Sequence, residues 1–177
     1  MNDLTDRVSV RHAVDSDVTL ISVLASTTFY EAYFEQDESA NLAAYIHESF
    51  TVAAIRSQLR DPESSFILIF LDGKAVGYAR LIENATSDGI SPGSTIELRR
   101  LYMLERVWGT GIGTTLLEYC VDEGRNRGFD IFWLGVWEEN ERAIRFYDKF
   151  GFSQVGTISF PYGDVVGTNR VLQRFLK

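Results

Sequence analysis

The feature that most constrains this chain is a glycine-rich turn between an apolar run and a helical run. The turn reads W-G-T-G-I-G-T over residues 108–114 and follows the apolar residues 101–104. Its alternating glycines, Gly109, Gly111 and Gly113, let the backbone turn tightly and approach a ligand closely. The first amides of the following helix have no partner inside the helix and lie at the positive end of its dipole. The pattern therefore predicts a strand, an anion-binding turn and a helix, with pyrophosphate as the favoured ligand.

The spacing of the glycines separates this turn from two common nucleotide-binding motifs. A P-loop carries a lysine after its last glycine, and Thr114 stands at that position here. The dinucleotide fingerprint G-x-G-x-x-G also fails at Thr114, where its third glycine should be. Taken alone, a glycine-rich turn is a weak signal, and the alternative is a tight turn that binds nothing.

A second motif lies between Trp133 and Phe152. It reads N-x-x-A-x-x-F-Y-x-K-x-G-F and includes Asn140, Tyr147 and Lys149. Together with L-Y-M-L-E-R-V-W-G-T-G-I-G, in this order and at this separation, it resembles the GNAT superfamily of acyl-CoA-dependent N-acetyltransferases. The resemblance implies an α/β (α+β) fold, with a mixed, mostly antiparallel sheet of about seven strands flanked by helices. It also implies that the glycine turn holds the pyrophosphate of an acyl-CoA.

Further segments resemble the PaiA-type spermidine/spermine acetyltransferases and extend the likeness over essentially the whole chain. They are T-F-Y-E-A-Y-F near residue 28, A-Y-I-H-E-S-F ending at Phe50, E-L-R-R-L-Y, W-L-G-V-W-E-E-N, and S-F-P-Y-G-D near the end. The chain departs from the GNAT pattern at Trp108, where the family often has Gln or Arg. Backbone amides do most of the binding in such a turn, so the assignment of the turn is kept.

Composition and length indicate a folded chain of modest size. The chain has 177 residues, of which 45% are hydrophobic, and we expect one domain over residues 1–177. No apolar run approaches the roughly 18 residues of a membrane span, and the first ten residues are too polar for a signal peptide. The single cysteine, Cys120, excludes an intrachain disulfide and favours a reducing cytoplasm. His12 and His47 show no metal-ligand spacing, so we expect no metal.

Acidic residues are concentrated in the first fifty positions. The net charge of −8 disfavours a general nucleic-acid binder. Residues 1–50 hold nine acids and two bases, whereas residues 51–177 hold sixteen acids and fifteen bases. The nine acids are Asp3, Asp6, Asp15, Asp17, Glu31, Glu35, Asp37, Glu38 and Glu48. Carboxylates beside an acceptor site attract cationic amines. The alternative is that they lie on ordinary solvated helix faces.

Hydrophobic periodicity and turn signals give a consistent order of elements. We expect strands at 8–14, 65–71, 75–83, 95–104, 131–137, 152–159 and 165–175, and helices at 15–34, 38–49, 52–60, 112–127 and 140–150. Asp15 or Ser16 is the expected cap of the first helix. Asp72-Gly73 predicts a hairpin turn, and the polar stretch 84–94 predicts a loop.

Acetyl transfer from a thioester to an amine needs a proton donor for the departing thiolate. Tyr147 is the candidate acid, because a phenol with a pKa of about 10 can protonate a thiolate with a pKa of about 8.5. The alternative is a core tyrosine, since Tyr147 also lies on an apolar helical stripe with Ala143, Phe146 and Phe150.

The amine is mostly protonated at neutral pH, so the reaction also needs a base or a water relay. Glu97 is the candidate base, because other GNAT enzymes place a glutamate on this strand; the alternative is a surface strand carboxylate. The N–H groups of Met103 or Leu104 would bond the pantetheine arm or polarise the thioester carbonyl, unless the two residues are simply core strand. Cys120 lies on the apolar face of its helix, which favours an inert buried thiol over an acyl nucleophile.

These observations predict an acyl-CoA-dependent N-acetyltransferase that acetylates a small primary amine, with a polyamine as the favoured acceptor. The residues expected to bind acetyl-CoA are Met103, Leu104, Trp108, Gly109, Thr110, Gly111, Ile112, Gly113, Thr114, Asn140 and Lys149. Other acceptors stay open, namely an amino acid, an antibiotic or a protein N-terminus, and so does a CoA-binding sensor without turnover. We expect neither nucleic acid nor membrane as a partner, and the sequence leaves a homodimer open.

Overall fold

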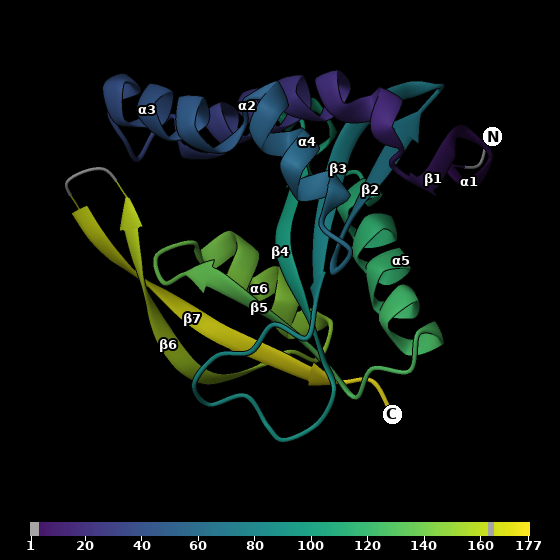
Figure 1. The fold of residues 1–177 in the computed structure, drawn as a ribbon, viewed down its shortest axis with the longest axis vertical. Helices are drawn as coiled ribbons and strands as arrows, with labels where there is room; N and C mark the ends of the chain where they lie inside the picture. Colours follow the sequence, from purple (N-terminus) through teal and green to yellow (C-terminus); the bar gives the residue numbers. More distant parts are fainter. Residues whose placement is uncertain (1–3, 163–164) are drawn as a thin grey trace. The chain divides into compact units, whose positions relative to one another are not determined.

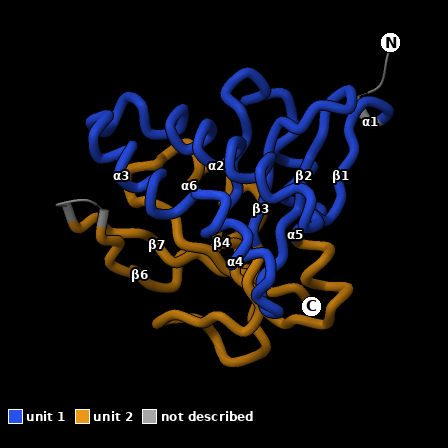
Figure 2. Tube along the Cα trace, turned by 45° about the horizontal axis from the view of Figure 1, so that its top comes forward, with its two compact units in different colours: residues 1–80, 100–120 blue, residues 81–99, 121–177 orange. Residues whose placement is uncertain are grey.

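The computed structural model describes residues 4–162 and 165–177 (Figure 1). The chain forms two compact units, which Figure 2 shows in different colours. Unit 1 comprises residues 1–80 and 100–120, and unit 2 comprises residues 81–99 and 121–177. The expectation of a single domain stays a prediction.

Seven strands form one sheet with the order β1-β2-β3-β4-β5-β7-β6. The strands are β1 (Val8–His12), β2 (Ser64–Leu71), β3 (Lys74–Glu83), β4 (Thr95–Met103), β5 (Ile131–Trp137), β6 (Ser153–Tyr162) and β7 (Val165–Phe175). The β4–β5 pair is parallel, whereas the β1–β2, β5–β7 and β6–β7 pairs are antiparallel. The expected fold class, a mixed and mostly antiparallel sheet flanked by helices, is confirmed.

The helical elements fall close to the expected positions. They are α1 (Leu4–Arg7), the short η1 (Asp15–Asp17), α2 (Val18–Tyr33), α3 (Ser39–Ser49), α4 (Val52–Arg60), the short η2 (Glu105–Val107), α5 (Ile112–Asn126) and α6 (Glu141–Lys149). The sequence analysis did not predict α1 or η2. No helix in the described part of the chain is both long and apolar enough to cross a bilayer.

In unit 1, helices cover both faces of the β2–β3–β4 region. The hairpin turn between β2 and β3 has positive φ angles at Asp72 (50°) and Gly73 (75°), as a two-residue hairpin turn requires. On one face, Phe29 of α2 stacks on Tyr45 of α3 and meets Tyr102 of β4 edge-on. On the other face, the Met103 side chain lies against Gly113 of α5. Unit 1 therefore has an aromatic layer under α2–α4 and a mainly aliphatic layer under α5.

In unit 2, the strands β5, β7 and β6 enclose a small core with the loop that follows β3. Ile131, Trp133 and Val171 form this core. The Trp133 indole N–H donates to the carbonyl of Ala85 at 2.8 Å, and the Thr95 hydroxyl donates to the same carbonyl at 2.7 Å. These bonds hold the predicted 84–94 loop on the sheet.

The start of the first long helix differs from the prediction. The expected cap was wrong, because neither Asp15 nor Ser16 caps the helix with its side chain. Residues 15–17 form a 3-10 turn instead, and the Asp17 carboxylate accepts the N–H of Val14 at 2.9 Å. Asp17 also forms a two-point ion pair with Arg11, and the bonds to this guanidinium lower the pKa of Asp17. The side chain thus closes the strand–helix corner.

Strand ends differ by a few residues. β1 ends at His12 instead of residue 14, and β4 ends at Met103 instead of Leu104. β6 continues to Tyr162, so the S-F-P-Y part of the S-F-P-Y-G-D segment is strand. The last two residues of that segment, 163–164, lie outside the described residues.

Candidate active site

The glycine turn of unit 1 has the backbone that the sequence predicts. Gly109 and Gly111 have φ angles of 74° and 92°, a conformation that favours glycine. A Cβ atom at either position would meet no neighbour within 4 Å, so these glycines serve backbone geometry and do not relieve crowding. Both are exposed, and α5 begins directly after them at Ile112. The first amides of α5 therefore lie beside an open, solvent-accessible turn.

Trp108 ties this turn to the end of β4. Its indole N–H donates to the Met103 carbonyl at 2.9 Å. Within the turn, the Thr110 hydroxyl donates to the Val107 carbonyl at 2.7 Å. The departure from the family pattern at position 108 thus has a structural role, since the side chain bonds the strand that precedes the turn.

The main-chain groups of Met103 point away from β3. The Leu104 N–H donates to the Val76 carbonyl of β3 at 2.8 Å. Because alternate residues of a strand direct their N–H and C=O groups to opposite sides, those of Met103 face the other way. Pairing with β5 covers only Thr95–Glu97 of β4, so it does not extend to Met103.

Tyr147 and Asn140 belong to α6 in unit 2. Asn140 caps this helix, because its side chain accepts the N–H of Ala143 at 3.1 Å. Tyr147 is 8% exposed and meets the rings of Phe146 and Phe152 edge-on. Lys149, in the last helical turn, is exposed. Tyr147 thus lies among aromatic rings, as the core-tyrosine alternative predicts.

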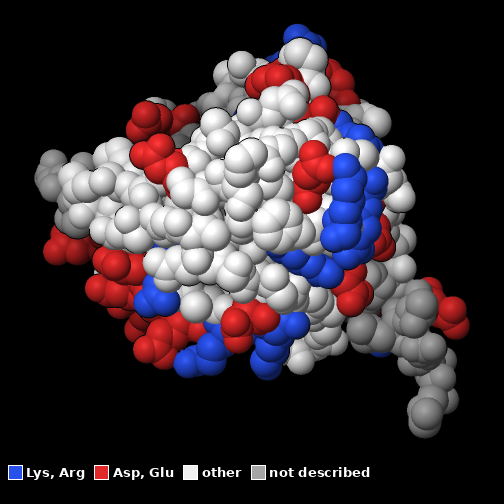
Figure 3. Space-filling view, turned by 90° about the horizontal axis from the view of Figure 1, so that it is seen from below, with Lys and Arg blue, Asp and Glu red and all other residues white. Residues whose placement is uncertain are grey.

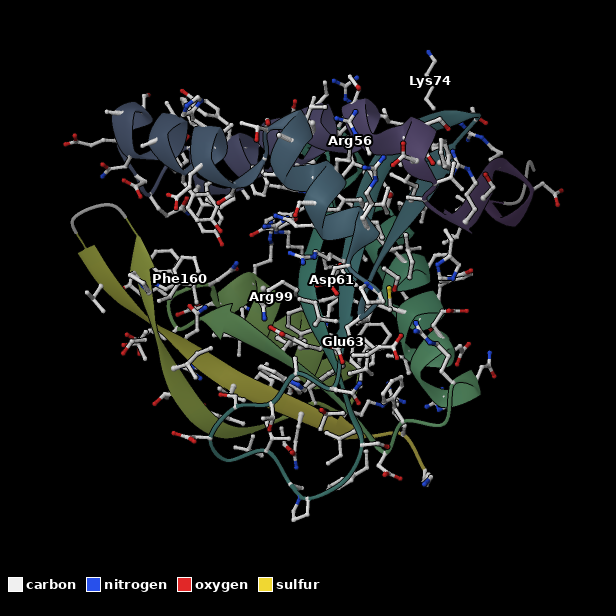
Figure 4. All side chains as sticks on the ribbon, viewed as in Figure 1. Arg56, Asp61, Glu63, Lys74, Arg99 and Phe160 are labelled. Carbon is white, nitrogen blue, oxygen red and sulfur yellow. The ribbon has the colours of Figure 1, made fainter. Side chains whose placement is uncertain are left out.

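Glu97 of β4 is a buried carboxylate, 5% exposed. Both of its oxygens accept bonds of 2.6 Å from the Arg99 guanidinium, in a two-point ion pair. The pair forms because residues two apart on a strand share a face. Arg99 is labelled in Figure 4. Glu97 is therefore not a surface carboxylate. The ion pair with Arg99 fixes the direction of its carboxylate.

The structure places the predicted residues in two groups. Unit 1 brings together Met103, Leu104, Trp108 and the turn 109–114, and unit 2 holds Glu97, Asn140, Tyr147 and Lys149. Cys120 is fully buried. His12 meets the Tyr119 ring edge-on at 6.2 Å. The described residues contain no group of three or more His, Cys, Asp or Glu side chains that could hold a metal ion.

A set of polar residues under α2–α4 in unit 1 was not predicted from the sequence. Tyr78 is fully buried, and Arg100 stacks on Phe50. The hydroxyls of Tyr33 and Tyr102 lie 3.4 Å apart, and burial raises the pKa of both phenols. Strand alternation at β3 and β4 predicts which of these residues share a face, but not the helix residues that they meet.

Charged side chains are mixed in sign on the face drawn in Figure 3. Basic side chains form a short stripe on the right and a further group among acidic side chains at the lower edge, and uncharged atoms cover most of the face. In the described residues of the first fifty positions, Asp15 and Asp17 are paired with Arg60 and Arg11. Part of the acidic excess is therefore neutralised locally.

Comparison with known proteins assigns the family. The model of the acetyltransferase (GNAT) family matches residues 25–152. An uncharacterised N-acetyltransferase of Mycobacterium bovis is 31% identical over 148 residues, which cover 84% of this chain and 90% of that protein. One from Lactobacillus delbrueckii subsp. lactis is 25% identical over 170 residues, covering 96% and 98%. The chain belongs to the GNAT family and is an acetyl-CoA-dependent N-acetyltransferase.

A solved structure shows the same fold. The PaiA N-acetyltransferase from Thermoplasma acidophilum, crystallised with coenzyme A, aligns with a TM-score of 0.77. The alignment covers 95% of this chain and 98% of that chain, at 19% sequence identity. At this identity the likeness concerns the fold, and the acceptor of this chain is a separate question.

Proposed function

We propose that the chain transfers the acetyl group of acetyl-CoA to a small primary amine. The observation that carries the proposal is the exposed turn 109–111, which leads into α5 next to the outward-facing amide of Met103. The turn fits a pyrophosphate, because helix amides and the helix dipole favour an anion there. The coenzyme A in the similar PaiA structure is consistent with this assignment.

Main-chain groups form most of the proposed acetyl-CoA site. Amides in the segment Gly109–Thr114 hold the pyrophosphate, with the exception of the Thr110 N–H, which donates to the Val107 carbonyl. Of the two strand amides considered, the Leu104 N–H already bonds Val76, so we assign the thioester carbonyl to the Met103 N–H. Trp108 contributes by holding the Met103 carbonyl. Asn140 and Lys149 stay predicted contacts of the CoA arm.

Acetyl-CoA supplies an activated acetyl group. The amine nitrogen bonds to the acetyl carbon, the carbon–sulfur bond breaks, the ammonium proton is lost, and the CoA thiolate takes up a proton. We assign this last proton to the Tyr147 phenol. We assign deprotonation of the amine to Glu97, either directly or through a water. A carboxylate oxygen that accepts one bond from Arg99 keeps capacity for a second.

The narrower acceptor predicted from the sequence is a polyamine. Its support is the acidic α2–α3 connection, where Glu35 and Glu38 are exposed. Other acids of this segment have structural roles. Glu31 accepts the N–H of Glu105 at 2.8 Å, and Asp37 accepts the N–H of Glu38 at 2.7 Å. The polyamine prediction therefore rests on long-range attraction, which salt screens.

The lone buried Cys120 supports a cytoplasmic location.

Release of free CoA thiol with a panel of amines tests the proposed function. We expect at least one primary amine to accelerate thiol release and to appear as its N-acetyl product. If spermidine is the acceptor, its KM rises with ionic strength more than the KM of acetyl-CoA does. Binding of acetyl-CoA without acceleration by any amine would contradict the proposal and favour a CoA-binding sensor.

A further inference from the structure

A polar cluster lies among aromatic rings on the face of unit 1 that α2, α3 and α4 cover. Tyr78 of β3 stacks near Phe66 of β2 and Tyr102 of β4, with ring centroids 6.2 and 6.1 Å away. Tyr78 is fully buried, and its hydroxyl has no hydrogen-bond partner among the described residues. A buried hydroxyl without a partner is costly and rare, so its presence calls for a ligand or another function.

Arg100 of β4 brings a positive charge to this cluster. Its guanidinium lies 4.7 Å from the centroid of Phe50 and donates to Gln58 of α4 at 2.9 Å. In the part of the chain that the structure describes, no carboxylate lies within ion-pair distance of Arg100. Its positive charge acts on the Tyr78 hydroxyl, while burial raises the pKa of that phenol and keeps it a neutral donor.

Arg100 and Tyr78 supply donors of the kinds that bind a carboxylate. A guanidinium binds a carboxylate with two parallel bonds, and a phenol adds a third donor. Arg80 adds positive charge nearby, since its guanidinium lies over Phe66 and donates to the Ser64 hydroxyl at 3.0 Å. Arg100 is only partly buried, so a solute can reach it from solvent. Its flat guanidinium also binds carboxylates more selectively than a lysine would.

The cluster lies on the strand that leads to the assigned acetyl position. Arg100 precedes Met103 by three residues, which is about 10 Å along a strand. The Met103 amide is the group assigned to the thioester carbonyl. An acceptor can hold its amine near Met103 while a second group reaches Arg100 if the arginine side chain or a longer acceptor, such as lysine, spans this distance.

We infer that Arg100 and Tyr78 bind a carboxylate of the acceptor, so that the acceptor is an amine that also carries a carboxylate, as amino acids do. The inference rests on the proposed function, because it names the acceptor class of the same reaction. It competes with the polyamine prediction, since a polyamine brings only positive charge to these two groups. Both acceptor classes enter the same experiment.

Pairs of acceptors that differ only by a carboxylate test the inference. The pairs are lysine with cadaverine, phenylalanine with phenethylamine, and alanine with ethylamine, measured by thiol release. We expect the carboxylate-bearing member of at least one pair to have a kcat/KM about tenfold or more above its partner. Preference for the decarboxylated member in all three pairs, or for spermidine over every carboxylate-bearing amine, overturns the inference.

Variants then locate the recognition. Arg100→Gln should raise the KM of the preferred carboxylate-bearing amine about tenfold or more and leave that of its decarboxylated partner within about twofold. Arg56→Gln is the matched control, because it removes the same charge from α4, where Figure 4 labels Arg56. An equal loss with both members of the pair, or an equal effect of the control, contradicts the assignment to Arg100.

Tyr78→Phe separates a binding role from a structural one. It removes only the partnerless hydroxyl, so the melting temperature should stay unchanged or rise, while the KM of the carboxylate-bearing amine rises. A lower melting temperature with an unchanged KM contradicts the inference for Tyr78.

A binding measurement covers the case in which no pair is turned over. Calorimetry with acetyl-CoA first tests the proposed function by itself. Calorimetry with phenylacetate as the probe then tests Arg100, because its carboxylate and ring match the cluster. Binding by the wild-type chain and loss in Arg100→Gln support the inference, whereas absent or unchanged binding overturns it.

Discussion

The groups that we assign to acetyl transfer differ in kind between the two units. In unit 1, the groups assigned to acetyl-CoA are main-chain amides of the turn 109–113 and of Met103. In unit 2, the assigned groups are side chains, the Tyr147 phenol and the Glu97 carboxylate. Main-chain amides persist when side chains change, which explains how the turn keeps its geometry with Trp108 at a position where relatives often differ. A side-chain role, in contrast, depends on single atoms.

We expect the largest effect on the rate of acetyl transfer from a substitution at Tyr147. Tyr147→Phe removes one proton donor and almost no volume, so we expect kcat to fall roughly 100-fold while affinity for acetyl-CoA stays nearly constant. Steady-state kinetics and calorimetry measure the two quantities. Tyr119→Phe on α5 is the control for the loss of a phenol, and it should keep the wild-type rate. A Tyr147→Phe variant with the wild-type kcat would assign thiolate protonation to another group.

Crowding at Gly77 tests how closely the main chain of unit 1 is packed beneath the site. A Cβ atom at this position would lie 2.5 Å from the Met103 sulfur and 2.7 Å from the Tyr102 carbonyl oxygen. Gly77→Ala should therefore lower the free energy of unfolding by about 1–3 kcal/mol and raise the KM for acetyl-CoA, because Met103 must move. Gly135→Ala is the control, since its Cβ would find ordinary contacts of 3.4 Å or more. Equal stability of the two variants in urea would contradict this packing argument.

In each unit, a tryptophan indole N–H donates to a main-chain carbonyl. Trp108 bonds Met103 at 2.9 Å in unit 1, and Trp133 bonds Ala85 at 2.8 Å in unit 2. Replacing either tryptophan by phenylalanine removes one hydrogen bond, which contributes about 1 kcal/mol to stability, and also part of the ring volume, which costs more at the buried Trp133. Only Trp108→Phe should also lower kcat/KM for acetyl-CoA, by about fivefold, because it frees the strand that holds the Met103 amide. The same kinetics in both variants would remove Trp108 from the site.

Local sequence signals predicted most of the fold. The ranges of α4, β5 and β7 were predicted to the residue, and Asp72-Gly73 forms the expected hairpin turn. These elements have strong periodicity or turn residues with a defined backbone preference. The expected cap at Asp15 or Ser16 was wrong. The corner before the helix is closed by Asp17 instead, through its ion pair with Arg11 of the preceding strand.

The candidate site was predictable only where it is local in sequence. The glycine turn is contiguous, so its composition indicates its backbone. The Glu97–Arg99 pair was also accessible, since residues two apart on a strand share a face, but it was not predicted. The partners of Arg100 and Tyr78 were not accessible, because Phe50 and Gln58 reach Arg100 from different helical segments. Such contacts depend on tertiary packing, which no local pattern encodes.

Binding of acetyl-CoA to a Gly111→Asp variant, followed by calorimetry, tests the central claim most directly. A carboxylate at this position would face the assigned pyrophosphate, so affinity should fall by on the order of 2 kcal/mol or more. Gly128→Asp is the matched control, because Gly128 also has a positive φ, 82°, and open space for a Cβ, but follows the end of α5. Weak binding in Gly111→Asp and wild-type binding in the control is the predicted result. Wild-type affinity in Gly111→Asp would contradict a backbone site for acetyl-CoA at this turn.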